Sequence, residues 1–331
     1  MNNTIFNNVR ILITGGTGSW GRTLSRLLLA TYNIKEIVIF SRGELQQVLM
    51  QRDFGFDKRI KFVIGDIRDY SAVAQACKEI DIIFHLAALK HVPICEEHPQ
   101  EAIKTNIFGT TNIVNAAIAN NVKKVIDVST DKAVEPLNLY GMTKAVGEKL
   151  ILQANDIAHT TKFVCVRGGN VMGSNGSVIP FFIDEIKKGG PVRLTDRDMT
   201  RFFLTLEEAI KLLFRAAEVG VGKETFVMNM PSCRIADLLT VLMDHHGHVP
   251  VSEIGSKPGE KLHEVLISHH ESPVTKELDQ DYFVILPHRS DSIATDTYSH
   301  LPDFQYKEFA SNTKLMNYDQ IVEMLKQGKF I

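Results

Sequence analysis

The sequence predicts an α/β fold, a doubly wound parallel sheet with a smaller C-terminal lobe. Short apolar, β-branched segments alternate with helical stretches from the N-terminus to about residue 170. This alternation is typical of parallel strands joined by right-handed crossover helices. Beyond residue 170 the pattern loosens. We therefore expect a sheet domain over 1–170, a smaller lobe over 171–290 and a C-terminal segment of uncertain order over 291–331.

The expected elements follow from local periodicity and from turn residues. Strands of the sheet are expected at 9–14, 36–40, 60–64, 80–85, 122–128 and 163–167. Helices are expected at 105–119 and 140–149 and, in the smaller lobe, near 181–188, 206–219 and 235–244, with a strand near 225–229. Residues 257–264 are expected to form a turn that leads into a helix.

A glycine-rich loop follows the first strand at once. Glycines at 15, 18 and 21 form a G-x-x-G-x-x-G pattern between that strand and a helical run. In this position glycines allow a tight turn and a close approach to a pyrophosphate, which the helix N–H groups bind. The pattern therefore predicts a Rossmann-type dinucleotide site, made by Gly15, Thr17, Gly18, Ser19, Trp20 and Gly21.

The end of the second strand indicates which dinucleotide is bound. Ser41 and Arg42 stand where an NAD site usually has an acidic residue for the ribose hydroxyls. A hydroxyl and a cation suit a 2′-phosphate instead. We therefore expect NADP, the alternative being a solvated Arg42 with Glu44 as the ribose ligand.

The next two strand ends supply further cofactor contacts. Asp66, followed by Ile67, either meets the adenine or caps the helix that begins near Ser71. After the fourth strand the small residues Ala87 and Ala88 let the backbone lie against a cofactor. Lys90 follows in the same loop.

The stretch from 128 to 144 carries the chemically most suggestive residues. Thr130, Asp131 and Lys132 leave the end of a buried strand, and Tyr140 and Lys144 lie four residues apart on one helix face. An ammonium one turn from a phenol favours the phenolate and so lowers the phenol pKa. A threonine hydroxyl can hold a substrate oxygen while the phenolate removes its proton.

Composition excludes several other classes of protein. The chain has 37 basic and 39 acidic residues, a net charge of −2, which argues against nucleic acid or an anionic membrane as the main partner. Its four cysteines have no C-x-x-C spacing, and no apolar run approaches the ~20 residues of a membrane span. No carboxylate or thiolate partner stands at ligand spacing from the histidines near 245–248 and 269–270, so no metal site is predicted. We expect a cytoplasmic protein with buried thiols.

These motifs resemble the extended short-chain dehydrogenase/reductase family and, within it, the UDP-N-acetylglucosamine (UDP-GlcNAc) 4,6-dehydratases, especially the 5-inverting type that begins pseudaminic acid synthesis. The resemblance runs from Ile11 to about Ile285. It rests on T-G-G-T-G-S at 14–19, A-A-L-K-H-V-P at 87–93, S-T-D-K-A at 129–133, N-L-Y-G-M-T-K at 138–144, G-S-V-I-P-F-F at 176–182, M-T-R-F at 199–202 and P-G-E-K-L-H-E at 258–264. Departures are Gly168 for a usual tyrosine, Trp20 for phenylalanine and Lys257 for arginine. Tyr140 favours the 5-inverting branch, because some related dehydratases have methionine there.

The resemblance implies a mechanism with tightly bound NADP. Tyr140 takes the proton of the C4 hydroxyl as hydride leaves C4, with Thr130 and Lys144 completing the site. Lys132 then removes the C5 proton and Asp131 protonates the leaving C6 hydroxyl. Hydride return to C6 gives UDP-2-acetamido-2,6-dideoxy-β-L-arabino-hex-4-ulose. The scheme requires Lys132 to be neutral part of the time and Asp131 to hold a proton.

The resemblance also implies substrate contacts and self-association. Asn170, Arg201 and Glu260 match UDP-sugar contacts, with a structural role as the alternative for Arg201. The remaining expected contacts are Lys90, His91, Ser177, Val178, Thr195 and Lys257. A homo-oligomer, hexamer or dimer, is expected.

Three other functions stay open at this point. One is a 5-retaining UDP-GlcNAc 4,6-dehydratase. Another is a UDP-sugar 4-epimerase, against which the Asp131–Lys132 pair argues, because epimerisation needs no acid–base pair for C5 and C6. The third is a non-catalytic scaffold that senses NADP.

Overall fold

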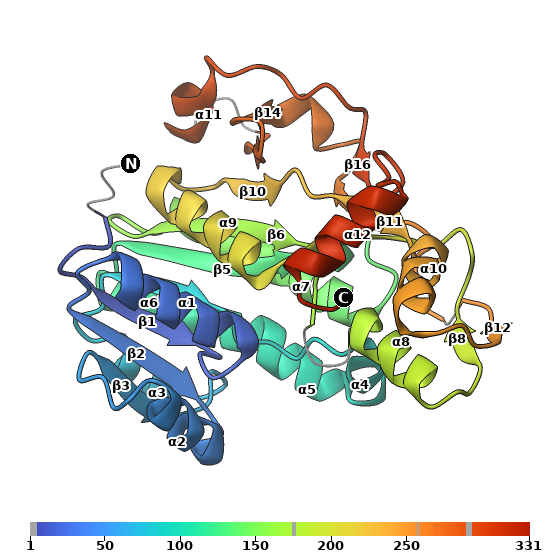
Figure 1. Ribbon diagram of the computed structural model, residues 1–331. Helices are drawn as coiled ribbons and strands as arrows, with labels where there is room; N and C mark the ends of the chain where they lie inside the picture. Colours follow the sequence, from blue (N-terminus) through green and yellow to red (C-terminus); the bar gives the residue numbers. More distant parts are fainter. Residues whose placement is uncertain (1–4, 174–176, 257, 289–292) are drawn as a thin grey trace.

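The computed structural model describes residues 5–173, 177–256, 258–288 and 293–331, and it confirms the doubly wound α/β fold (Figure 1). A nine-stranded sheet has the order β14-β15-β10-β6-β5-β4-β1-β2-β3. Its strands are β1 (Arg10–Thr14), β2 (Glu36–Ser41), β3 (Ile60–Ile64), β4 (Ile82–His85), β5 (Lys124–Thr130), β6 (Lys162–Gly168), β10 (Thr225–Met228), β14 (Thr275–Glu277) and β15 (Tyr282–Ile285). The strands from β10 to β3 pair in parallel, whereas β15 and β14 are antiparallel.

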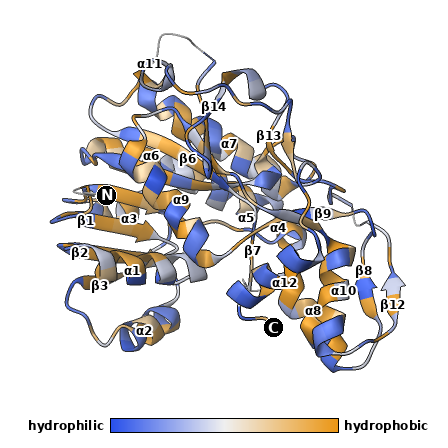
Figure 2. Ribbon diagram, turned by 45° about the horizontal axis from the view of Figure 1, so that its top comes forward, coloured by the Kyte–Doolittle hydropathy of each residue, from blue (hydrophilic) through white to orange (hydrophobic). Residues whose placement is uncertain are grey.

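Helices cover both faces of this sheet and bury its apolar side chains. They are α1 (Ser19–Thr31), α2 (Glu44–Asp53), α3 (Tyr70–Ala76), α6 (Gly109–Ala119), α7 (Leu139–Gln153) and α9 (Leu206–Val219). Leucines and alanines of α1 and α9 pack in one core cluster, and apolar residues of α3, α6 and α7 pack in a second. Figure 2 shows the strands as largely hydrophobic and the helices as amphipathic, as expected for a sheet covered on both sides.

A smaller lobe lies beside the sheet at one end of the molecule (Figure 1). It contains β7 (Asn170–Val171), α8 (Val178–Lys187), β8 (Val192–Leu194), β9 (Thr200–Leu204), β11 (Ser232–Arg234), α10 (Ile235–His246), β12 (Val251–Glu253) and α12 (Tyr318–Gln327). Helices α8, α10 and α12 share a third core cluster. The other elements are α4 (Val92–Glu97), α5 (Pro99–Ile103), β13 (Val265–Ile267), α11 (Ile293–Tyr298) and β16 (Phe309–Ala310).

Most predicted elements are confirmed within a few residues, and two differ. The helix expected at 105–119 begins as a π-helical turn, Lys104–Phe108, before α6. The turn at 257–264 leads into strand β13 and not into a helix, because Val265–Ile267 pairs with the distant β16. Within 293–331 the chain forms α11, β16 and α12, and α12 starts with a capping box between Asn317 and Gln320.

Three strands of the large sheet, β10, β15 and β14, come from beyond residue 170. The division into 1–170, 171–290 and 291–331 stays a prediction. In the part of the chain that the structure describes, no helix combines the length and the apolarity needed to cross a membrane.

Candidate active site

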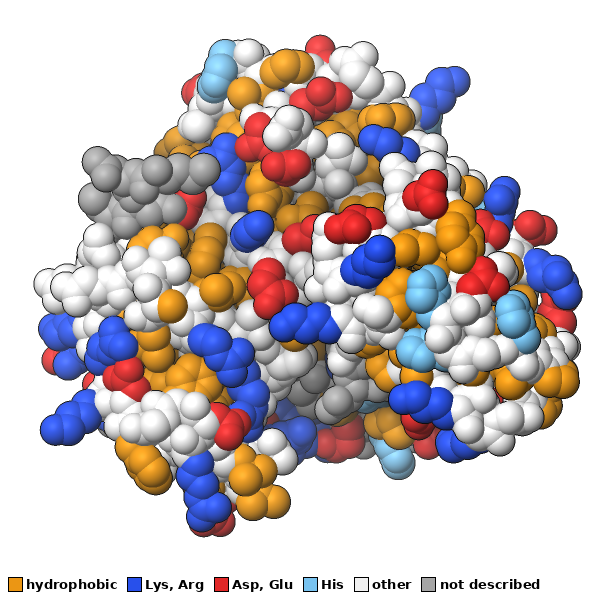
Figure 3. Space-filling model, viewed as in Figure 1, with side chains coloured by type: hydrophobic (Ala, Val, Ile, Leu, Met, Phe, Trp, Pro, Cys, Tyr) orange, Lys and Arg blue, Asp and Glu red, His pale blue; other side chains and the backbone are white. Residues whose placement is uncertain are grey.

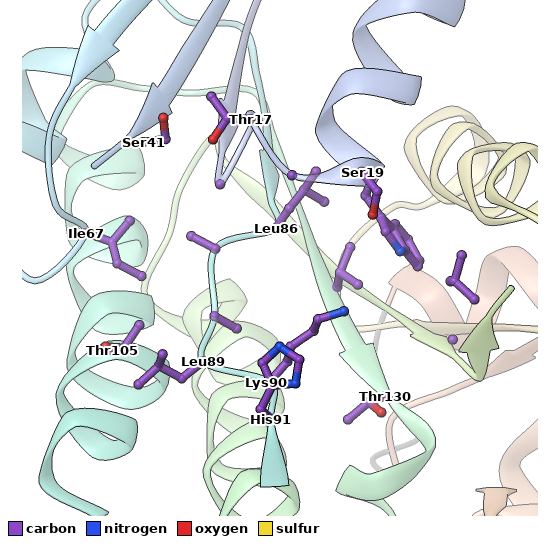
Figure 4. A pocket seen from close by; sticks show the side chains of 18 of the residues that line it. Thr17, Ser19, Ser41, Ile67, Leu86, Leu89, Lys90, His91, Thr105 and Thr130 are labelled. Carbon is purple, nitrogen blue, oxygen red and sulfur yellow. The ribbon is translucent and has the colours of Figure 1, made fainter. Parts of the chain in front are cut away.

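A cavity of about 870 Å³ opens at the carboxyl ends of the parallel strands, where the strand order reverses between β1 and β4. In doubly wound sheets ligands bind at this reversal. The predicted site residues that line the cavity are Gly15, Thr17, Gly18, Ser19, Trp20, Ser41, Arg42, Asp66, Ile67, Ala87, Ala88, Lys90, His91, Thr130, Asp131, Lys132, Tyr140, Asn170 and Ser177. Figure 4 shows Lys90 and His91 projecting from the loop after β4, between Ser19 and Thr130.

The glycine-rich loop has the backbone geometry that a dinucleotide site needs. Gly15 has φ +63°, and a Cβ there would lie 2.9 Å from the Cα of Ala87. A Cβ on Gly21 would lie 2.3 Å from the carbonyl oxygen of Gly16. Helix α1 begins at Ser19, and its N-cap residue Gly18 makes no side-chain capping bond. The first-turn N–H groups therefore suit a pyrophosphate, and the chain fits the dinucleotide that the sequence predicts.

The end of β2 presents a hydroxyl and a cation to the cavity. The Ser41 hydroxyl accepts a hydrogen bond from Gln47 Nε2 at 3.0 Å, and the exposed Arg42 lies 3.9 Å from Asp66. Burial raises and the hydrogen bonds from Arg68 lower the pKa of Asp66, with a net downward shift. Asp66 therefore lines this end of the cavity as a carboxylate. Glu44, the alternative ribose ligand, is not part of the cavity lining that the structure describes.

Local packing brings the reactive residues of 130–144 together. Thr130 ends β5, a single 3-10 turn (Asp131–Ala133) follows, and Asn138 caps α7 by accepting from the Gly141 N–H. A Cβ on Gly141 would lie 2.1 Å from the carbonyl oxygen of Lys132. The start of α7 can therefore lie directly on the Asp131–Lys132 turn only because residue 141 is glycine.

Burial dominates the electrostatics of Tyr140. It raises the Tyr140 pKa, whereas Lys144, Lys132 and a hydrogen bond with Thr130 lower it, and the net shift is upward. Burial therefore outweighs the two ammonium groups and the Thr130 hydrogen bond in the protein alone, because removing a phenolate from water is unfavourable. The direction in which Lys144 acts on the phenol is as predicted.

Lys144 has a buried partner that sequence reasoning missed. Its Nζ lies 3.3 Å from Asp127 Oδ2, and the two side chains are 3% and 0% exposed. Asp127 is in register with His85 on the neighbouring strand, with Nε2 to Oδ1 at 4.0 Å. Burial lowers the pKa of His85 to about 4. The His85 ring also bonds the hydroxyls of Thr14 and Thr110. The sequence did contain a signal for this buried cluster, namely an aspartate and a histidine inside two otherwise apolar strand segments.

Lys132 lies between two carboxylates. Its Nζ is 3.0 Å from Asp131 Oδ1 and 3.2 Å from Glu264 Oε1. Burial lowers the Lys132 pKa, but the two carboxylates raise it by more, so the net shift is upward. The protein alone therefore holds Lys132 as a cation, opposite to the neutral state that the predicted base role requires. Glu264 belongs to the P-G-E-K-L-H-E motif but was not among the predicted site residues.

Arg201 and several other predicted contacts are not in the lining. Arg201 is buried and donates to the carbonyl oxygens of Thr200 at 2.6 Å and of Lys261 at 2.9 Å. These bonds favour the structural alternative for Arg201. Among the described residues, the lining also excludes the predicted site residues Gly21, Lys144, Val178, Thr195 and Glu260. Lys257 lies outside the described residues. Substrate contact by these side chains stays a prediction.

Two departures from the family pattern lie against each other. A Cβ on Gly168 would be 3.5 Å from Cη2 of Trp20, and both residues line the cavity. The larger indole therefore lies beside the position where the usual tyrosine is absent. Gly168 pairs in register with Thr130, so the contact between Trp20 and Gly168 forms the part of the cavity wall next to the end of β5.

The doubly wound sheet, the glycine-rich loop and Tyr140 at one cavity, with Lys144 one turn further along α7, are those of an extended short-chain dehydrogenase/reductase. Residues 11–286 match the family described as polysaccharide biosynthesis protein, and the chain belongs to this family. An inverting UDP-N-acetylglucosamine 4,6-dehydratase of Campylobacter jejuni is 44% identical over 286 residues, 86% of this chain and 84% of that protein. A protein of Rickettsia bellii named UDP-glucose 4-epimerase is 40% identical, over 97% of this chain and 96% of its own. The solved structure of Pen from Bacillus thuringiensis has a TM-score of 0.89 at 38% identity, covering 98% of this chain and 99% of that one. These matches confirm the predicted resemblance.

Proposed function

We propose that this chain is a UDP-GlcNAc 4,6-dehydratase that inverts C5. The observation that carries the proposal is the Asp131–Lys132 pair, which lines the same cavity as Tyr140 and Thr130. A 4,6-dehydration needs a base at the C4 hydroxyl and a separate acid–base pair for C5 and C6, and the site has residue types for all three roles. The Campylobacter jejuni relative bears this activity in its name.

The first step uses the helix α7 side of the site. Tyr140 takes the proton of the C4 hydroxyl, which Thr130 holds by a hydrogen bond. Lys144, held by Asp127 at 3.3 Å, stays cationic and stabilises the phenolate. A nicotinamide dinucleotide held by the glycine-rich loop would supply the hydride acceptor at C4 and the hydride donor at C6.

The elimination uses the turn that follows β5. Moving one proton from Lys132 to Asp131, across 3.0 Å, converts the ion pair into a neutral amine and a carboxylic acid. The amine then removes the C5 proton, and Asp131 protonates the C6 hydroxyl, which leaves as water. Asp131 Oδ1 is the oxygen that receives and passes on this proton, because it lies 3.0 Å from Lys132 Nζ, whereas Oδ2 is buried without a hydrogen-bond partner among the described residues. A proton from solvent, added to C5 on its opposite face as hydride returns to C6, gives the inverted 4-keto sugar.

NADP is the proposed cofactor, because Ser41 and Arg42 line the adenosine end of the cavity. We expect Arg42→Ala to weaken NADP binding by roughly 10- to 100-fold and NAD binding little, since a charge-assisted bond to a 2′-phosphate contributes about 1.5–3 kcal/mol. Quenching of Trp20 fluorescence measures both affinities, because Trp20 is the single tryptophan and lines the cavity. Arg52→Ala, on the last turn of α2, is the control. Equal losses for NADP and NAD would contradict the assignment.

The proposal extends to the setting of the enzyme. It comprises a cytoplasmic homo-oligomer, hexamer or dimer, acting at the first step of pseudaminic acid synthesis. The resemblance supports these points. On the face in Figure 3, acidic and basic side chains are interspersed, in keeping with the net charge of −2 and a small-molecule substrate.

A 4-epimerase is the second candidate, because the Rickettsia bellii protein of that name covers 97% of this chain. Both reactions begin with C4 oxidation by a tyrosine. They differ at C5 and C6, where an epimerase needs no proton transfer. The buried contact of Asp131 with Lys132 favours the dehydratase.

Incubation of the purified protein with UDP-GlcNAc in D₂O, without added NADP, tests the function. We expect loss of one water, deuterium at C5 and a changed C5 coupling pattern in mass and proton NMR spectra. Unchanged C5 configuration in a deuterated product would contradict inversion. A C4 epimer without loss of water would identify the epimerase, and no reaction even with added NADP⁺ would overturn both.

A further inference from the structure

Glu264 reaches the elimination site from a distant part of the chain. It directly precedes β13, is 2% exposed, and its Oε1 lies 3.2 Å from Lys132 Nζ. Its backbone is held from both sides by Ser311, whose hydroxyl accepts from the Glu264 N–H and whose own N–H donates to the Glu264 carbonyl oxygen. The carboxylate is therefore fixed in place next to Lys132.

The neighbouring loop docks on the same turn. Lys261 Nζ donates to the Val134 carbonyl oxygen, and Asn138 Nδ2 donates to the Gly259 carbonyl oxygen. Residues 259–264 thus contact the chain on both sides of the turn that carries Asp131 and Lys132. Glu264 itself does not line the cavity, so among the described residues it acts on the reaction through Lys132.

Arg201 gives Glu264 a second positive charge besides Lys132. Its Nε lies 3.8 Å from Glu264 Oε1, and its terminal nitrogens are bound to backbone carbonyl oxygens. When the Lys132 proton passes to Asp131, Glu264 keeps Arg201 as its counter-charge. The other charged or titratable groups facing Lys132 are Tyr140 from α7 and Lys261 from the 259–264 loop.

We propose that Glu264 is a positioning residue for the elimination: it holds the Lys132 ammonium beside Asp131 and keeps the shared proton on the amine until substrate is bound. The consequence for the reaction rests on the proposed function. The proton position itself does not, because it is a property of the protein alone. The step involves one proton moving from Lys132 nitrogen to an Asp131 oxygen, with no oxidation or reduction.

Amine reactivity of Lys132 tests the proposal without substrate. Acetic anhydride reacts with an amine only in its neutral form, and mass spectrometry reports labelling of the Lys132 peptide relative to an exposed lysine of the same protein. Removing an opposite charge within about 4–6 Å lowers a lysine pKa by about 1–3 units. We therefore expect Glu264→Gln to raise Lys132 labelling at pH 8 by at least about tenfold. Glu253→Gln, at an exposed residue of the smaller lobe that pairs with Arg197, should leave Lys132 labelling unchanged.

Glu264→Asp keeps the charge but withdraws it by one methylene. The labelling rates should therefore rise in the order wild type, Glu264→Asp, Glu264→Gln. If Glu264→Gln does not fold, the comparison of Glu264→Asp with wild type carries the test. Equal labelling in wild type and in the folded variants would overturn the proposal.

Turnover in D₂O supplies the second readout. The pH profile of C5 deuteration should move to lower pH in Glu264→Gln, whereas a structural role would lower the rate without moving the profile. If the wild type does not dehydrate UDP-GlcNAc but labelling rises as expected, the proposed function fails and the role of Glu264 in holding the proton stands. If labelling is unchanged in the variants but the wild type dehydrates UDP-GlcNAc, the proposed function stands and the role of Glu264 fails.

Discussion

Two lysines of the candidate site, Lys132 in the turn after β5 and Lys144 on α7, form ion pairs whose surroundings differ. Lys144 is 3% exposed and pairs with Asp127, a partner only seventeen residues earlier in the same sheet domain. Lys132 is 23% exposed, lines the cavity and needs Glu264, which comes from the far part of the chain. A lysine in a fully buried ion pair keeps its proton, whereas a lysine that lines a cavity can pass its proton to a neighbouring group. This difference is why we propose a permanent cation at Lys144 and a movable proton at Lys132.

Replacing either lysine by methionine is expected to have the largest effect and to stop the reaction at different points. Lys144→Met should slow C4 oxidation by roughly 10²–10⁴-fold. Lys132→Met should abolish C5 deuteration while C4 oxidation and cofactor binding persist. Single-turnover absorbance at 340 nm follows the first step and NMR in D₂O follows the second. Loss of both steps in Lys132→Met would remove the distinction between the two sites.

Asp127→Asn should cost about 3–5 kcal/mol of the free energy of unfolding, because it leaves the buried Lys144 charge without its partner. The double variant Asp127→Asn/Lys144→Met removes both charges and should recover much of this loss. Urea denaturation measures the free energy of unfolding of the wild type, the single variant and the double variant. A double variant that is no more stable than Asp127→Asn would show that the pair does not act as a unit.

Gly141→Ala tests the contact that sets Lys132 against α7. Its Cβ would lie 2.1 Å from the Lys132 carbonyl oxygen, and the backbone must shift to admit it. Overpacking of this kind costs about 1–3 kcal/mol, and we expect kcat to fall as Lys132 moves relative to Tyr140. Gly147→Ala is the matched control on the same helix, since its Cβ would approach its nearest atom, the Asn106 carbonyl oxygen, only to 3.4 Å. Equal losses of stability and of kcat in both variants would show that the contact between residue 141 and the Lys132 carbonyl oxygen does not position Lys132.

The buried His85 should make the stability of the folded protein sensitive to acid. Its pKa is about 4 in the folded protein and 6.5 in a free side chain, so below pH 6.5 the unfolded chain binds a proton that the folded one excludes. The free energy of unfolding must then decrease as the pH falls, by roughly 1.6 kcal/mol between pH 6.5 and 5. Urea denaturation of the wild type and of His85→Asn at both pH values isolates this share, because the other groups titrate alike in both. An equal pH dependence in the two proteins would contradict it.

The active-site residues close together in sequence could be predicted without the structure. The glycines at 15, 18 and 21, the end of β5 and the Tyr140–Lys144 spacing are local patterns, and a strand followed by a helix places them at one sheet edge whatever the rest of the chain does. The same holds for helices such as α9, whose predicted bounds, 206–219, match the structure.

Only the tertiary structure decided which charges face each other. Glu264 reaches Lys132 across 132 positions, and His85 meets Asp127 through the register of β4 and β5. The direction of each pKa shift depends on burial and on these partners, which is why the expected lowering at Tyr140 and the neutral state of Lys132 did not follow from spacing. Strand β13 differs from the predicted helix for the same reason, since its partner β16 lies more than forty residues away. Local patterns set local structure, but electrostatic energy depends on distance in space.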